Sequence, residues 1–80
     1  MREWRFTAYF AARVLAKRPY LNRAWCIYAI ESAIRSEPQE GNRWRFRAAI
    51  AELQGRYLRV VTLADEVTIH NAFLDRRFRP

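Results

Sequence analysis

Eight consecutive residues alternate almost strictly between arginine and apolar side chains, and this run constrains the fold more than any other feature. Residues 43–50 place Arg43, Arg45 and Arg47 on one side and Trp44, Phe46, Ala48 and Ile50 on the other. A repeat of two residues is that of a β-strand with one buried face. The run therefore predicts a strand that turns its arginines away from the core.

Two more strands are predicted in the second half of the chain. Tyr57–Leu63 (YLRVVTL) follows Gly55 and is rich in β-branched residues. After the polar tip at residues 64–66, Val67–Phe73 (VTIHNAF) returns as an antiparallel partner. The register of this hairpin stays open. A two-residue loop places Arg59 and His70 on one face, and a three-residue loop separates them.

The first half of the chain predicts two helices. Thr7 is a capping residue for a helix that runs to about Arg18, where Pro19 stops it. Asn22 caps a second helix that runs to about Ser36, before Pro38. Its apolar residues follow helical spacing and include Cys26, Ile27, Ile30, Ala33 and Ile34.

These elements predict one α+β domain over residues 1–80. Two N-terminal helices pack on one face of a three- to four-stranded antiparallel sheet, because the helices precede the strands instead of alternating with them. The helices can cover only one side of so small a sheet. The other side is then open, and it carries Arg43, Arg45 and Arg47.

The charge balance indicates a polyanionic partner. Fifteen basic residues oppose eight acidic ones, for a net charge of +7, and fourteen of the fifteen are arginine. Guanidinium binds phosphate oxygens in pairs. Alternate strand positions lie roughly 7 Å apart, close to the phosphate spacing of a nucleic-acid strand. The alternative is a charged face that is merely solvated.

Other classes of site have little support. One cysteine and one histidine allow neither an intrachain disulfide nor a metal site, and no cofactor motif is present. Cys26 is one of the apolar residues of the second predicted helix, so it is expected to pack in the core and to be unreactive. The longest apolar run, residues 24–30, is too short for a signal sequence or membrane span, so a cytoplasmic location is expected.

A few single residues are candidates for chemistry. His70 is the only histidine and so the natural acid or base near neutral pH, although a lone histidine in a strand is more often structural. Tyr57 can stack on a base or donate a proton, or it can be an ordinary sheet aromatic. Asp75 is a candidate to hold Arg76 or Arg45 in place. The tail arginines form a phosphate clamp or a frayed end, and they are Arg76, Arg77 and Arg79.

Several strings together resemble a group of small bacterial proteins. They are RPYL at residues 18–21, a helix with a single cysteine, R-x-R-F at residues 43–46, YLRVVTL, and TIHNAF-x-DRRF at residues 68–78. In this order they resemble the RelE/ParE-like toxin superfamily, with the BrnT-type toxins as relatives. The resemblance spans residues 6–78. Arg13 and the pair Arg47-Ala48 depart from it, where relatives often have a histidine and an aromatic-glycine pair.

The resemblance implies the toxin of a type II toxin-antitoxin system. Such a protein is a metal-independent endoribonuclease that cleaves mRNA, free or on the ribosome, and it is neutralised by a cognate antitoxin through which it can oligomerise. Carried over to this chain, the resemblance points to Arg43, Arg45, Arg59 and His70, with Arg76 and Arg77 behind them. Together with the residue pattern, this gives as catalytic candidates His70, Arg59, Arg45 and Tyr57, and as nucleic-acid-binding candidates Arg43, Arg45, Arg47, Arg76, Arg77 and Arg79. A non-catalytic binding module for nucleic acid or protein and a gyrase-directed toxin are the alternatives.

Overall fold

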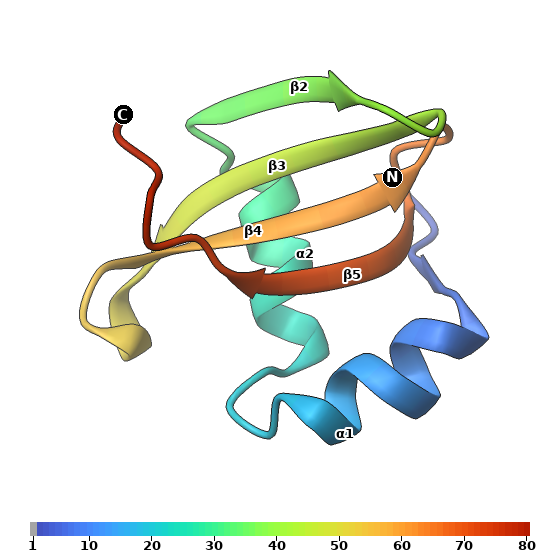
Figure 1. The fold of residues 1–80 in the computed structure, drawn as a ribbon, viewed down its shortest axis with the longest axis horizontal. Helices are drawn as coiled ribbons and strands as arrows, with labels where there is room; N and C mark the ends of the chain where they lie inside the picture. Colours follow the sequence, from blue (N-terminus) through green and yellow to red (C-terminus); the bar gives the residue numbers. More distant parts are fainter. Residues whose placement is uncertain (1) are drawn as a thin grey trace.

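Five strands form a single sheet in the order β1-β5-β4-β3-β2 (Figure 1). The computed structural model describes residues 2–80, and its strands are β1 (Arg5–Phe6), β2 (Arg35–Gln39), β3 (Arg43–Ile50), β4 (Arg56–Leu63) and β5 (Thr68–Leu74). Neighbouring strands are antiparallel except β1, which is parallel to β5. The α+β class is therefore confirmed, with a sheet one or two strands wider than expected.

The first helix begins where the sequence predicts. Thr7 Oγ1 accepts a hydrogen bond from the backbone N–H of Phe10 at 3.1 Å, which caps the helix. The helix continues through a π-helical segment, η1 (Phe10–Val14), into α1 (Leu15–Lys17). Phe10 and Val14 are almost completely buried, so this helix is held to the sheet by its apolar side.

The second helix, α2 (Arg23–Glu31), is shorter than predicted. Asn22 caps it by accepting a hydrogen bond from the backbone N–H of Trp25 at 2.8 Å. The predicted end at Ser36 is wrong, because residues 35–39 form β2 instead. Pro38 lacks an N–H group and therefore suits an edge strand, which is the place of β2.

The central strands lie within one residue of their predicted bounds. The turn between β2 and β3 contains Gly41 and Asn42, both with positive φ, and the short helix η2 (Ala51–Leu53) leads to Gly55 and β4. A β-bulge at Val61/Thr62 shifts the register between β4 and β5. Because of this shift, Arg59 lies opposite Phe73 and not near His70 in the ladder.

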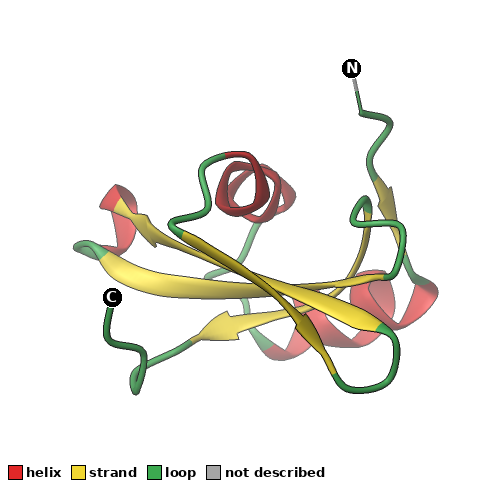
Figure 2. Cartoon of the chain, turned by 90° about the horizontal axis from the view of Figure 1, so that it is seen from above, coloured by secondary structure: helices red, strands yellow, loops and turns green. Residues whose placement is uncertain are grey.

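Both helices contribute to one core on one face of the sheet. The α2 helix packs on β3 and β4, and η1 packs on β5. In Figure 2 the twisted sheet is seen along its edge, with α2 on one side and the C-terminal segment turning away on the other. The buried core consists of Phe10, Val14, Leu21, Cys26, Ala29, Ile30, Phe46, Ala48, Ile50, Leu58, Val60, Ile69 and Ala72. Within the described part of the chain, every helix is too short or too polar to span a lipid bilayer.

Candidate functional site

The helix-free face of the sheet gathers arginines from three adjacent strands. In the ladder, Arg47 of β3 lies directly between Arg35 of β2 and Arg59 of β4. Arg45 is on the same face, two residues along β3. We refer to Arg35, Arg45, Arg47 and Arg59 as the arginine cluster. Like charges opposite one another destabilise a sheet, so the cluster needs counter-charges.

Two carboxylates supply those counter-charges. Glu37 Oε1 lies 3.0 Å from Arg47 Nη1 and 3.4 Å from Arg45 Nε. Asp75 Oδ2 lies 2.9 Å from Arg47 Nε and 3.7 Å from Arg59 Nη1. The expectation of a bare row of guanidiniums is therefore wrong, because two of its three members are paired within the chain. The predicted partner of Asp75 was Arg76 or Arg45, and the structure places it on Arg47 and Arg59 instead.

Arg47 is the organising member of the cluster. Its side chain is 10% exposed, and it is bonded to both carboxylates. The ring of Phe78 covers it, with the guanidinium carbon 4.6 Å from the ring centroid, a cation–π distance. Arg47 is thus largely buried, contrary to the solvent-facing position predicted for it.

The two carboxylates are ionised in this setting. Hydrogen bonding from Arg45 lowers the pKa of Glu37, and Arg47 adds to the effect. Burial alone would raise the pKa of Asp75, but hydrogen bonds from Arg47 and the Arg77 backbone outweigh it and lower the pKa. Each carboxylate therefore carries a full negative charge near neutral pH.

Arg59 is a partly buried cation of the cluster whose hydrogen bonding is incomplete. Its Nη2 donates a hydrogen bond to Gln39 Oε1. Its Nε is buried and has no hydrogen-bond partner among the described residues. Burial, with the charges of Arg47 and Arg45, lowers its pKa. An anion near this guanidinium would relieve the repulsion between the three cations.

The cluster forms one wall of a shallow depression of about 460 Å³, which we call the basic depression. Its lining consists of Arg35, Glu37, Arg45, Arg47, Arg59, Asp75, Arg77, Phe78 and Arg79. Six arginines thus face two carboxylates, so the internal ion pairs leave the depression strongly positive. The concave shape and excess positive charge suit an anion with several oxygens.

Three of the predicted nucleic-acid ligands are not members of the arginine cluster. Arg43 lies at the far end of β3, opposite Leu63. Arg76 and Arg79 are exposed on the C-terminal segment. Arg79 lines the basic depression, whereas Arg76 lines a neighbouring pocket.

His70 is held at the β-bulge by residues that follow β1. Its Nδ1 lies 3.0 Å from Thr7 Oγ1, and its ring stacks on Tyr9 with centroids 5.0 Å apart. Burial, with a contribution from Arg43, lowers its pKa, so the imidazole is neutral at neutral pH. No ion pair or hydrogen bond among the described residues links His70 to the arginine cluster. The sequence candidates thus fall into two separate groups.

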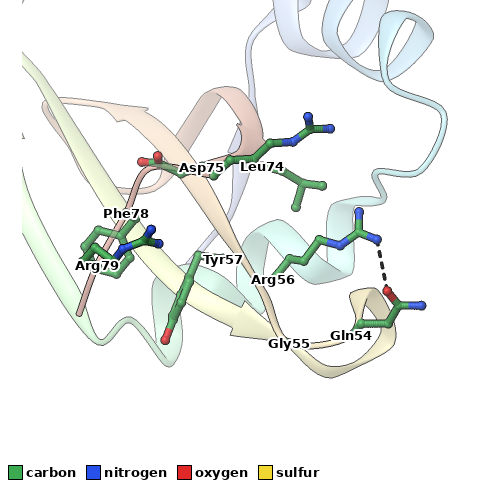
Figure 3. A pocket seen from close by; sticks show the side chains of 9 residues that line it. Gln54, Gly55, Arg56, Tyr57, Leu74, Asp75, Phe78 and Arg79 are labelled. Carbon is green, nitrogen blue, oxygen red and sulfur yellow. Dashed lines mark hydrogen bonds between the residues drawn. The ribbon is translucent and has the colours of Figure 1, made fainter.

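Tyr57 lies on the arginine side of the sheet, at the start of β4 and opposite Ala49. Its ring meets Phe78 edge to face, with centroids 5.1 Å apart. Both rings line a pocket of about 340 Å³, which we call the aromatic pocket (Figure 3). At its other end, Arg56 Nη2 donates a hydrogen bond to Gln54 Oε1 at 3.1 Å.

Sequence reasoning missed Arg35, Glu37 and Phe78 as members of the site. The signal for the first two was present, because Arg35, Glu37 and Gln39 alternate along β2 as strand residues do. The second helix was predicted to run to about Ser36, so Arg35 was assigned to that helix and Glu37 to no strand. Phe78 gave no periodic signal, since it acts from an irregular segment.

The comparisons with known proteins identify no family for the chain. It matches no protein-family model, no curated protein and no solved structure. The site is therefore interpreted from its own geometry.

Proposed function

We propose that this protein binds nucleic acid, and that the phosphate groups of the nucleic-acid backbone lie in the basic depression. The carrying observation is the ratio of six arginines to two carboxylates on one concave surface. Guanidinium groups bind phosphate oxygens by paired, charge-assisted hydrogen bonds. The net charge of +7 adds a long-range attraction for polyanions.

The internal ion pairs support this function instead of abolishing it. Glu37 and Asp75 fix the guanidiniums of their arginine partners, so less side-chain freedom is lost when a phosphate binds. Arg45 and Arg59 remain partly exposed, at 28% and 22%. These two, with the exposed Arg77, are the proposed phosphate ligands, and buried Arg47 keeps them in place.

Fluorescence anisotropy with a short labelled oligouridylate tests this function. Arg45→Ala and Arg77→Ala are each expected to weaken binding about fivefold or more, as loss of a charge-assisted contact does. Arg13→Ala is the matched control, because it removes the same charge from an exposed position on η1. Equal affinities for all three variants would show that the depression is not the binding surface.

RNA cleavage by a toxin-like protein is the second candidate function. Two helices on one face of a mostly antiparallel sheet agree with the fold that the RelE/ParE-like resemblance implies. The specific observation is that Thr7 orients the ring of His70, while a lowered pKa keeps it neutral. A positioned neutral imidazole is the usual form of a general base.

Incubation of RNA with the purified protein in excess chelator tests this candidate. Metal-independent cleavage that His70→Gln abolishes, with RNA affinity unchanged, would support it. Binding without cleavage would favour the non-catalytic module. Inhibited DNA supercoiling with intact RNA would favour the gyrase-directed alternative.

A toxin role also requires an antitoxin. An acidic segment from such a partner would compete for the same basic depression, because it offers carboxylates where the ligand offers phosphates. A small acidic reading frame beside the gene, whose product co-purifies with this chain and blocks growth arrest, would support that role.

A further inference from the structure

The aromatic pocket lies next to the basic depression and shares part of its wall. Asp75, Phe78 and Arg79 line both. Phe78 is central, because its ring contacts Arg47 and Arg35 in the basic depression and Tyr57 in the aromatic pocket. The two hollows therefore form one continuous binding surface.

The chemistry of the aromatic pocket fits a planar ring attached to a phosphate. Tyr57, Phe78 and Leu74 provide aromatic and aliphatic surface, and arginines stand at the rim. Stacking of nucleobases on aromatic side chains is the main sequence-tolerant contact in single-strand binding. Among the described residues, the Tyr57 hydroxyl has no hydrogen-bond partner in the structure, so its ring is not tied to another polar group.

The exposed rim carries the charge that such a ligand needs. Arg56 is steadied by Gln54 across the turn before β4, and Arg76 and Arg79 enter from the C-terminal segment. Figure 3 shows Arg56 and Arg79 at opposite ends of the hollow, with Tyr57 between them. A base over Tyr57 would thus be flanked by cations that can take the adjoining phosphates.

On the basis of the proposed function, we infer that the ligand is single-stranded nucleic acid, with an unpaired base in the aromatic pocket and adjacent phosphates in the basic depression. Bases inside a duplex are stacked on one another, so a duplex can offer phosphates to the depression but no ring to the pocket. The surface therefore selects single strands, loops or frayed ends.

Binding of four probes to the wild-type protein tests the inference. The probes are oligouridylate, oligothymidylate, a duplex of equal length, and a strand of equal length whose sugars carry no bases. Both base-carrying single strands are expected to bind roughly 5- to 150-fold more tightly than the abasic strand, the range for one stacked base. Tighter binding of oligouridylate would indicate that the natural ligand is RNA. Tighter binding of oligothymidylate would indicate that it is DNA.

Variants of Tyr57 assign the preference to the pocket. Tyr57→Leu should bind base-carrying and abasic strands alike, whereas Tyr57→Phe should keep the wild-type preference because stacking needs only the ring. Tyr28→Leu is the matched control, since Tyr28 is a half-exposed tyrosine on α2. Circular dichroism shows whether each variant is folded, and the abasic comparison in wild type does not depend on any variant.

The outcomes separate this inference from the function on which it rests. Salt-sensitive binding of all four probes with equal affinity would overturn the single-strand inference and leave phosphate binding standing. Failure of every probe to bind would overturn both. If Tyr57→Leu kept the preference for base-carrying strands, the base would not bind in the aromatic pocket.

Discussion

Arg47 Nε donates a hydrogen bond of 2.9 Å to Asp75 Oδ2, and this bond joins the middle of the sheet to the segment that follows its last strand. The two side chains are only 10% and 12% exposed. The pair therefore anchors residues 75–79 over the open face of β3. It also makes Arg47 a support for the site, so that its neighbours are the residues left to contact a ligand.

Loss of the Asp75 carboxylate should destabilise the fold. Asp75→Asn is expected to lower the free energy of unfolding by about 2 kcal/mol, because Arg47 loses a charged partner in a largely buried place. Glu37→Gln is the comparison and should cost less, since the Glu37 side chain is 36% exposed. Urea denaturation measures both. Equal midpoints for Asp75→Asn and wild type would contradict the anchoring role.

Acid should weaken the same anchor. The pKa of Asp75 in the folded chain lies below its ordinary value of 3.8, so its ion pairs contribute full stability above that value. This contribution is lost as the pH falls through the lower, folded-state pKa. Wild type should therefore lose stability below about pH 4 more steeply than Asp75→Asn. Parallel pH profiles for the two proteins, measured by urea denaturation, would rule out this linkage.

Thr7 should stabilise both the first helix and the position of His70 in β5. Its hydroxyl caps the first helix at Phe10 and contacts His70. Thr7→Val is expected to cost about 1 kcal/mol, the typical loss for a missing cap, whereas Thr7→Ser should retain most of the stability. Thermal unfolding compares the two variants. A shift in the imidazole pKa of His70 in Thr7→Val, followed by NMR, would confirm the second contact independently.

Cys26 should be chemically silent in the native protein. Burial raises its pKa to about 12, and its side chain is fully enclosed in the core. Because the thiolate is the reactive form, a thiol reagent at pH 8 should label Cys26 only after denaturant unfolds the chain. Rapid labelling under native conditions would show that the core around α2 opens readily.

Nucleic-acid binding should weaken as salt increases. Log affinity for a single strand is expected to fall by about 0.7 per neutralised phosphate for each unit of log salt. Arg59→Gln should reduce that slope by the contribution of about one phosphate, because the partly exposed side chain of Arg59 lines the basic depression. Arg13→Gln serves as the control of equal charge, and its slope should stay close to that of wild type. The same slope for Arg59→Gln and wild type would exclude Arg59 as a phosphate ligand.

The sequence predicted the architecture well where a single periodicity dominated. The alternation at residues 43–50 gave β3 with its bounds, and capping by Thr7 and Asn22 placed both helix starts. The end of α2 was missed because Ala33 and Ile34 continue the helical spacing. Pairing with β3, where the Ile34 N–H bonds to the Arg47 carbonyl, outweighed that local preference.

The site was harder to predict because it depends on contacts between distant residues. Alternation correctly put the arginines on the face opposite the helices, but it carried no information about Asp75, which comes 28 positions after Arg47. The β-bulge that separates His70 from Arg59 depends on the local pairing of β4 with β5. A sequence pattern with two possible loop lengths could not choose that register.

An NMR titration of the isotope-labelled protein with a short single-stranded oligonucleotide tests the central claim most directly. Side-chain Nε–Hε signals of Arg45 and Arg59, the ring of Tyr57 and the backbone of residues 75–79 should shift together and saturate with one affinity. Signals from η1 and α2 should stay in place. Shifts concentrated on the helices, with those arginine signals unmoved, would contradict the claim that the open sheet face binds the ligand.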